Sequence, residues 1–241
     1  MLELIPFDQY AYSGKSDTVD ITDEDQYALN IFLSNFSEQW FCESSTYDET
    51  TSTWVIEPAL FISNTADTMK LVEFACLYLK LNSSASVEFI SHNGHEYGSF
   101  SIESINSVTE RFFNRRVSVD EITSVEIFDG YYDYIVLDNN VCFAWGDGET
   151  YNHMSVATKI IEFDGDSIQV NFNIYSLDLD DNRVDAGGGI TDKSVYHYSL
   201  TDAKRDVNFK FHAKGTAVLV PYTTESGKET YQLLSYEIIS D

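Results

Sequence analysis

The chain has 241 residues, of which 43% are hydrophobic and 15% aromatic, so it can bury a sizeable core and is not an intrinsically disordered protein. Its 40 acidic residues against 14 basic ones give a formal net charge of −26 at pH 7. Such a surface repels phosphate backbones and anionic lipid headgroups. We therefore expect no nucleic-acid partner and no electrostatic docking on membranes.

Cysteine spacing and hydropathy exclude further classes of protein. Cys42, Cys76 and Cys142 are too far apart for a CxxC zinc knuckle or a disulfide framework. No stretch approaches the roughly 20 apolar residues of a membrane span, so we expect no direct membrane insertion by this chain. The N-terminus, MLELIPFDQYAYSG, has no basic region followed by an apolar run, so no signal peptide is predicted within it.

Residues 1–20 predict an extended lead-in, and residues 21–241 predict a single domain. A first helix is expected from about Thr22 to Cys42, because Thr22 is a cap residue and Asp25 follows three positions later. The helical spacing of apolar residues supports this helix, with a predicted buried stripe of Ala28, Ile31, Phe32, Phe36 and Trp40.

Two more helices and a hairpin follow. The second helix is expected to be capped by Asn64 or Thr65, with a buried face of Leu71, Phe74, Ala75, Tyr78 and Leu79. Asn93-Gly94 between two short alternating segments predicts a two-residue hairpin. The third helix is expected in ESINSVTERFFNRRV, with Ser104 as its cap.

From about Val117 to the end, the hydrophobic period changes to two, which predicts strands. In SIQVNFNIY the apolar residues alternate with polar ones, as in an antiparallel sheet with one packed face. We therefore predict an α+β fold, with about three N-terminal helices packed on a C-terminal antiparallel meander sheet. The order of two helices, a hairpin, a third helix and long strands is similar to the cone-shaped nuclear-transport-factor-like fold.

Four segments together resemble a known group of domains: ALNIFLSNFSEQWF, LVEFACLYLKLNS, SINSVTERFFNRRV and WGDGETYNHMSVATKI. As a set, they are similar to extracytoplasmic domains on lipoproteins or membrane-anchored proteins of gut clostridia and related Gram-positive bacteria. The resemblance covers roughly residues 22–175. It implies an extracellular or cell-surface location, with any signal or anchor outside this sequence and the cytoplasm as the alternative, but no reaction.

The signatures of nucleotide-binding proteins, zinc proteases and serine hydrolases are absent: GxGxxG, GxxxxGK[ST], HExxH and GxSxG. In FAWGDGETYNHM, an aromatic pair flanks a loop with two carboxylates, a mixture that suits sugar recognition. This candidate ligand site comprises Trp145, Asp147, Glu149 and Tyr151. The alternative is a strand end whose tryptophan fills the core, because tryptophan is highly buried on average.

The segment YSLDLDDNRVDAGGGI is rich in possible cation ligands. An EF-hand loop starting at Asp178 would need a glycine where Arg183 stands and a bidentate glutamate where Gly189 stands. The EF-hand interpretation therefore fails. Irregular, weak calcium binding remains an alternative for Asp178, Asp180, Asp181 and Asp185.

These observations predict a non-enzymatic extracytoplasmic binding or interaction domain whose partner is a glycan, a peptide or another surface protein. One alternative is a small-molecule-binding enzyme or sensor that uses a cavity in a cone-like α+β fold. Another is a structural spacer. No cofactor is expected.

Overall fold

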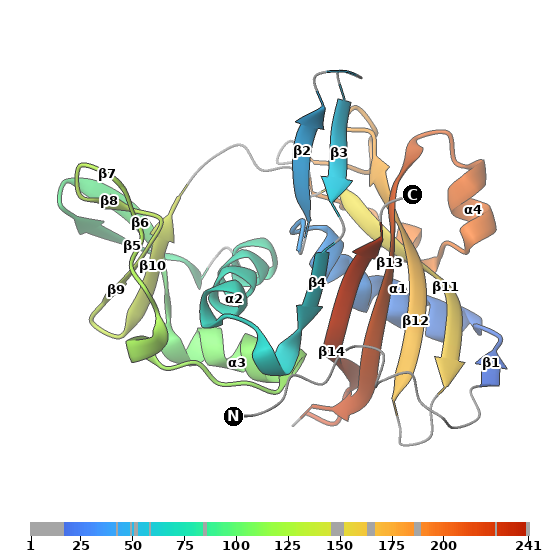
Figure 1. Cartoon of the computed structure of the whole chain (residues 1–241), viewed down its shortest axis with the longest axis horizontal. Coiled ribbons are helices and arrows are strands. Elements are labelled where there is room, and N and C mark those ends of the chain that lie inside the picture. The colour runs from blue at the N-terminus through green and yellow to red at the C-terminus, as the bar shows by residue number, and fades with distance from the viewer. Residues whose placement is uncertain are drawn as a thin grey trace.

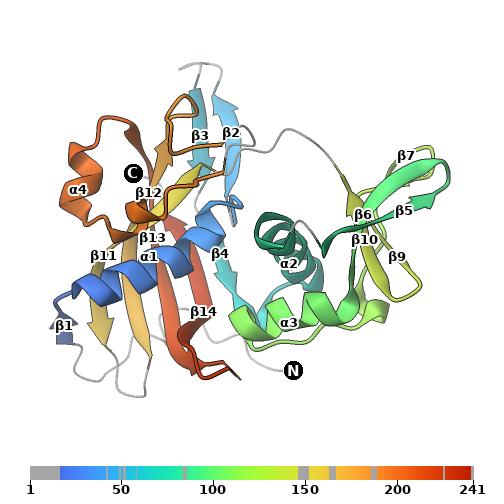
Figure 2. The same ribbon diagram turned by 180° about the vertical axis from the view of Figure 1, so that it is seen from behind.

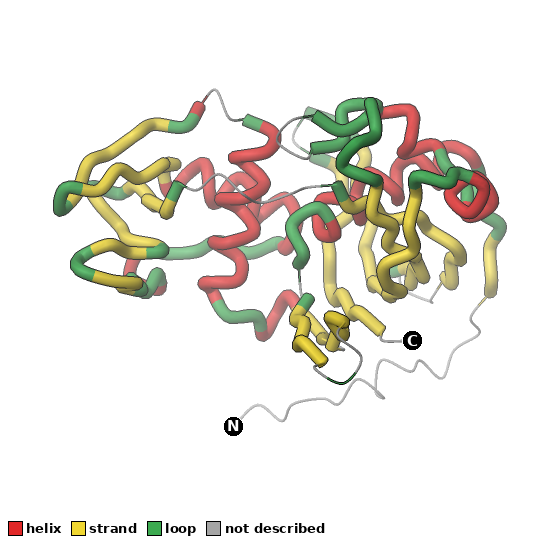
Figure 3. The backbone as a smooth tube through the Cα atoms, turned by 90° about the horizontal axis from the view of Figure 1, so that it is seen from above, coloured by secondary structure: helices red, strands yellow, loops and turns green. Residues whose placement is uncertain are grey.

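The computed structural model describes residues 17–41, 43–48, 50, 53–57, 59–83, 86–145, 152–162, 167–185, 189–224 and 226–239. Within them, four α-helices and mostly antiparallel strands form an α+β architecture, as predicted. Two sheets lie at opposite ends of the molecule, and helices α2 and α3 lie between them (Figures 1 and 3).

The larger sheet contains six strands. Their order is β1 (Asp17–Val19), β11 (His153–Glu162), β12 (Ile168–Leu177), β13 (Phe209–Thr223), β14 (Glu229–Ile239) and β4 (Ala59–Ile62). Strands β11 to β14 are the predicted antiparallel meander, and the predicted alternation of β12 is confirmed, because Val170, Phe172 and Ile174 are buried. Strand β4 pairs with β14 and forms the outer edge of the sheet.

Helix α1 (Asp23–Ser37) begins where the sequence predicts and ends earlier. The Thr22 hydroxyl accepts a hydrogen bond from the Asp25 amide and donates one to the Asp25 carboxylate. Phe32 and Phe36 are buried as predicted. The rest of the predicted stripe is wrong: Ala28 and Trp40 are exposed and Ile31 is half-buried, whereas Leu29 and Leu33 are buried.

A second buried side of α1 is polar and closes the edge of β11. Asn30 Oδ1 accepts a 2.8 Å hydrogen bond from the Ala157 amide, and Ser34 Oγ accepts a 3.0 Å bond from the Ser155 amide. Gln26 Nε2 donates to the Ala157 carbonyl. Since β1 pairs only with the far end of β11, these side chains replace a neighbouring strand. The amphipathic pattern of α1 therefore has two buried sides, one for the core and one for the sheet edge.

Helices α2 (Thr68–Asn82) and α3 (Ile102–Phe113) lie in the predicted segments but have different caps, and the predicted face of α2 is buried except for the half-buried Tyr78. Asp67 caps α2 in place of Asn64 or Thr65, which lie in the 3₁₀ turn η2 (Ser63–Thr65). Ser101 caps α3, and its hydroxyl accepts from the amide of Ser104, the residue predicted as the cap. The boundary shifts because several neighbouring residues can each cap a helix.

The second sheet corrects the prediction of one continuous meander. It has four strands, in the order β5 (Glu88–His92), β6 (His95–Ser101), β10 (Asn140–Ala144) and β9 (Tyr134–Leu137). The Asn93-Gly94 hairpin is confirmed, and both residues have the positive φ that a tight turn requires. Strand β10 pairs with β6 over five residues, so the third helix interrupts a sheet instead of preceding one.

Three smaller units complete the described fold. Strands β2 (Ser44–Asp48) and β3 (Thr53–Glu57) pair between α1 and β4, and β7 (Glu126–Phe128) pairs with β8 (Tyr131–Tyr132). The turns η4 (Val119–Glu121) and η5 (Lys193–His197) and helix α4 (Leu200–Arg205) lie between longer elements. One apolar cluster contains residues of α1, α2, α3 and both larger sheets, so these parts share a core.

Candidate functional site

Only one member of the predicted sugar-binding set lies in the described part of the chain. The half-buried Trp145 packs its ring edge-on against Phe89, with the ring centroids 5.2 Å apart, and Lys80 Nζ lies 5.1 Å from the centre of the Trp145 ring. These neighbours support the strand-end alternative, in which the indole fills space beside the core. Asp147, Glu149 and Tyr151 lie outside the described residues, so the sugar platform remains a prediction.

The four acidic candidates for calcium do not converge on one point. Asp181 is buried and binds Arg183 through both oxygens at 2.7 and 2.8 Å, while Asp178 pairs with the exposed Lys210. Asp180 donates its amide to Asp178, and Asp185 accepts the Gly189 amide. Arg183, which broke the EF-hand pattern, is thus the residue that organises the loop.

Arg183 also reaches Asp206 at 2.6 Å, and this pairing holds the start of β13 to the acidic loop. The guanidinium lowers the pKa of Asp181 well below its usual range. Among the residues that the structure describes, no three histidine, cysteine or acidic side chains are grouped as metal ligands. Calcium binding by Asp178, Asp180, Asp181 and Asp185 therefore remains an untested prediction with no support from their arrangement.

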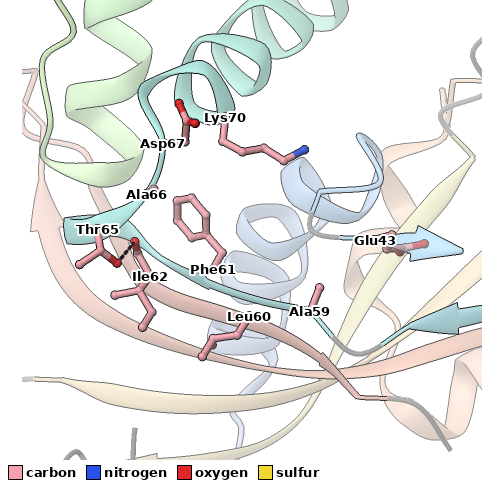
Figure 4. Close-up of a pocket in the computed structure, with 9 residues that line it drawn as sticks. All are labelled: Glu43, Ala59, Leu60, Phe61, Ile62, Thr65, Ala66, Asp67 and Lys70. Carbon is pink, nitrogen blue, oxygen red and sulfur yellow. Dashed lines mark hydrogen bonds between the residues drawn. The ribbon is translucent and has the colours of Figure 1, made fainter. Parts of the chain in front are cut away.

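A groove of about 450 Å³ runs along the outer edge of β4 (Figure 4). Four consecutive strand residues line it, and because neighbouring strand residues point to opposite faces, the groove follows the edge of the strand. Its floor is apolar. Glu43 closes the end beside Ala59, and Asp67 and Lys70 stand on the side formed by α2 (Figure 4).

Behind the groove, Glu43 belongs to a buried cluster with two histidines. His212 Nε2 lies 2.9 Å from Glu43 Oε2, a distance at which the imidazole N–H donates to the carboxylate. The His212 and His153 rings lie 4.4 Å apart, and the His153 ring packs edge-on against Trp40 at 4.4 Å. We call Glu43, His153, His212 and Trp40 the acid–histidine cluster.

Burial and the neighbouring His212 lower the pKa of His153 to about 3, so this ring is neutral at physiological pH. Its Nδ1 atom is enclosed and has no hydrogen-bond partner among the described residues, and the same holds for Glu43 Oε1 and both polar atoms of the Gln39 amide. Buried polar atoms are normally paired. In the described residues, most of the buried side-chain atoms without a hydrogen bond lie in or beside the acid–histidine cluster.

The sequence alone did not predict that these residues are neighbours. Glu43 and His212 are 169 positions apart, and each histidine is isolated in the sequence. The alternation of strand residues gives the face on which His153 and His212 lie, but not which strands are neighbours. One feature of the sequence could have indicated the cluster: the polar residue Glu43 directly follows the first predicted helix.

Comparisons with protein-family models, curated proteins and solved structures return no match to this chain. Of the helices in the described residues, none is long and apolar enough to cross a membrane.

Proposed function

We propose that this chain is a non-enzymatic interaction domain that binds an extended, positively charged segment of a partner protein along β4. The observation that carries this proposal is the edge of β4 inside the groove, which pairs with no other strand of the described residues. An edge strand presents unpaired amide and carbonyl groups that pair readily with another extended chain. Strand β4 has four residues, so the bound segment is about four residues long.

The chemistry of the groove supports a cationic partner. The apolar floor of Ala59, Leu60 and Ile62 suits alternate apolar side chains of an added strand. Glu43 lies at one end, and among the described residues its enclosed Oε1 atom has no hydrogen-bond donor, so this oxygen is the group that we assign to a lysine or arginine side chain of the partner. A net charge of −26 attracts a basic segment over a longer range and raises its rate of association.

The wider setting of this function is also a proposal. The resemblance to extracytoplasmic domains and the acidic surface support a role at or outside the cell surface, with a peptide of another surface protein favoured over a glycan. The order of the helices, of β4 and of the meander β11–β14 supports assigning the larger sheet and its helices to the nuclear-transport-factor-like cone.

The proposal can be tested with three hexapeptides by NMR titration of the ¹⁵N-labelled chain. The first alternates lysine and valine, the second alternates glutamate and valine, and the third is the lysine peptide with N-methylated backbone. We expect the lysine peptide to shift the amides of Ala59–Ile62 and the other two to bind at least tenfold more weakly. Equal binding of the methylated peptide would exclude strand addition, and equal binding of the glutamate peptide would exclude the charge argument.

A pair of matched variants locates the binding. Leu60 and Leu179 expose 45% and 52% of their surface, but only Leu60 lies in the groove. We expect Leu60→Arg to abolish binding of the lysine peptide and Leu179→Arg to leave it unchanged. The same loss in both variants would place the peptide elsewhere.

A further inference from the structure

A second, larger cleft lies along α1 and is separate from the acid–histidine cluster. Its volume is about 710 Å³, within the range typical of small-molecule sites. Residues along α1 from Glu24 to Asn35, the last turn of α3 and the β13–β14 hairpin surround it, and Figure 2 shows α1, α3 and β14. Its aromatic lining residues are Tyr27, Phe32, Tyr222 and Tyr231.

The cleft contains a fixed cation without a counterion. Arg111 donates from Nη1 to the Tyr78 hydroxyl at 2.9 Å, and its guanidinium lies 4.9 Å from the centre of the Phe112 ring. No carboxylate of the described residues forms an ion pair with it, and its Nε has no acceptor. Although the chain has 40 acidic residues, the contacts of Arg111 in the described residues are with aromatic side chains. Its guanidinium can therefore bind the carboxylate of a ligand.

Acidic side chains line the same cleft. Glu24 and Asp25 come from the first turn of α1, and Glu229 comes from the start of β14, beside Lys228. Burial, and then the charges of Asp25 and Glu229, raise the pKa of Tyr231, so both carboxylates lie near that phenol. Phe32 packs edge-on against Tyr231 with their centroids 5.7 Å apart, which gives an apolar wall between the two charged regions.

We propose that this cleft binds a small zwitterion with an apolar or aromatic body, such as a free amino acid. The carboxylate pairs with Arg111, the ammonium group pairs with Asp25 and Glu229, and the body packs on Phe32 and Tyr231. An anion alone could bind Arg111 but would be repelled by Glu24, Asp25 and Glu229, and a cation alone would make no use of Arg111. The site is separate from the β4 groove and does not depend on the function proposed for it.

Three probes that share a phenyl ring test the charge pattern by isothermal titration calorimetry. They are phenylalanine, 3-phenylpropionate, which lacks the ammonium group, and phenethylamine, which lacks the carboxylate. We expect phenylalanine to bind at least tenfold more tightly than either of the others. Equal affinity of phenylpropionate or of phenethylamine would overturn the zwitterion assignment, and so would the absence of phenylalanine binding at millimolar concentration.

Two variants assign each charge to a side chain. We expect Arg111→Gln to weaken phenylalanine and phenylpropionate at least tenfold and to leave phenethylamine unchanged. The exposed Glu229→Gln should weaken phenylalanine and phenethylamine but not phenylpropionate, and it keeps the proposal testable if loss of Arg111 prevents folding. Unchanged affinity for phenylalanine in the folded Arg111→Gln variant, or in Glu229→Gln, would refute the site.

Discussion

Substitution of Asn30 by leucine tests whether α1 seals the edge of the larger sheet. The Asn30 side chain is fully buried, and all its bonding capacity is used. Oδ1 accepts from the Ala157 amide and from Gln26 Nε2, both at 2.8 Å, and Nδ2 donates to the carbonyls of Tyr196 and Tyr198, both at 2.9 Å. Leucine has the same branching and the same number of side-chain heavy atoms but is bulkier, so the substitution removes the hydrogen bonds without opening a cavity.

The expected loss of stability follows from the groups that are left without partners. An unsatisfied buried donor or acceptor costs about 1–3 kcal/mol, and three backbone groups lose their partner in Asn30→Leu. The bond to the Tyr198 carbonyl is only partly buried, so water recovers part of that loss. We therefore expect a fall of about 3–5 kcal/mol in the free energy of unfolding, or a fall in Tm on the order of 10 °C.

Urea unfolding followed by circular dichroism measures this change, and Asn35→Leu is the matched control on the same helix. Asn35 donates only to the carbonyls of Ile31 and Phe32 within its own helix, so its replacement should cost less than about 1 kcal/mol. Hydrogen exchange of the Ala157 amide gives an independent measurement. Equal destabilisation by the two variants, or unchanged protection of Ala157, would refute the sealing role of α1.

Two further predictions concern ionised groups. Replacing Arg183 by methionine leaves the Asp181 side chain, only 3% exposed, without its main partner, so we expect a loss of about 3 kcal/mol by thermal unfolding. Lys210→Met removes an exposed ion pair with Asp178 and should change Tm little. An equal fall in Tm in the two variants would show that burial of Asp181 does not set the cost. Burial raises the pKa of Glu38 from 4.5 to about 7, although Tyr196 donates a 2.6 Å hydrogen bond to it. The folded state therefore holds this proton more tightly, and stability should fall as pH rises from 4.5 to 7, with the loss complete above 7. Urea unfolding of Glu38→Gln at pH 5 and 8 should show a smaller pH dependence than the original chain, and identical dependence would count against the assignment.

The periodicity of the sequence determined the local elements well. Three helices, the Asn93-Gly94 turn and the alternating strands of the meander follow from rules that act within about ten residues, although most of the predicted apolar stripe of α1 was wrong. Net charge predicted the absence of a nucleic-acid partner and cysteine spacing predicted the absence of a zinc knuckle, and both stay predictions. The caps of α2 and α3 could not be assigned from the sequence, because several neighbouring residues can cap a helix: Asn64, Thr65 and Asp67 before α2, and Ser101 and Ser104 at α3.

Only the tertiary structure decided which strands share a sheet and which polar residues meet. The pairing of β10 with β6 and the polar contact of α1 with β11 depend on contacts between segments far apart in the chain, and local pattern carries no information about them. The same is true of the acid–histidine cluster and of the contact of Arg111 with Tyr78. Local propensity acts over a few residues, whereas a site is formed by side chains that the folded core brings together.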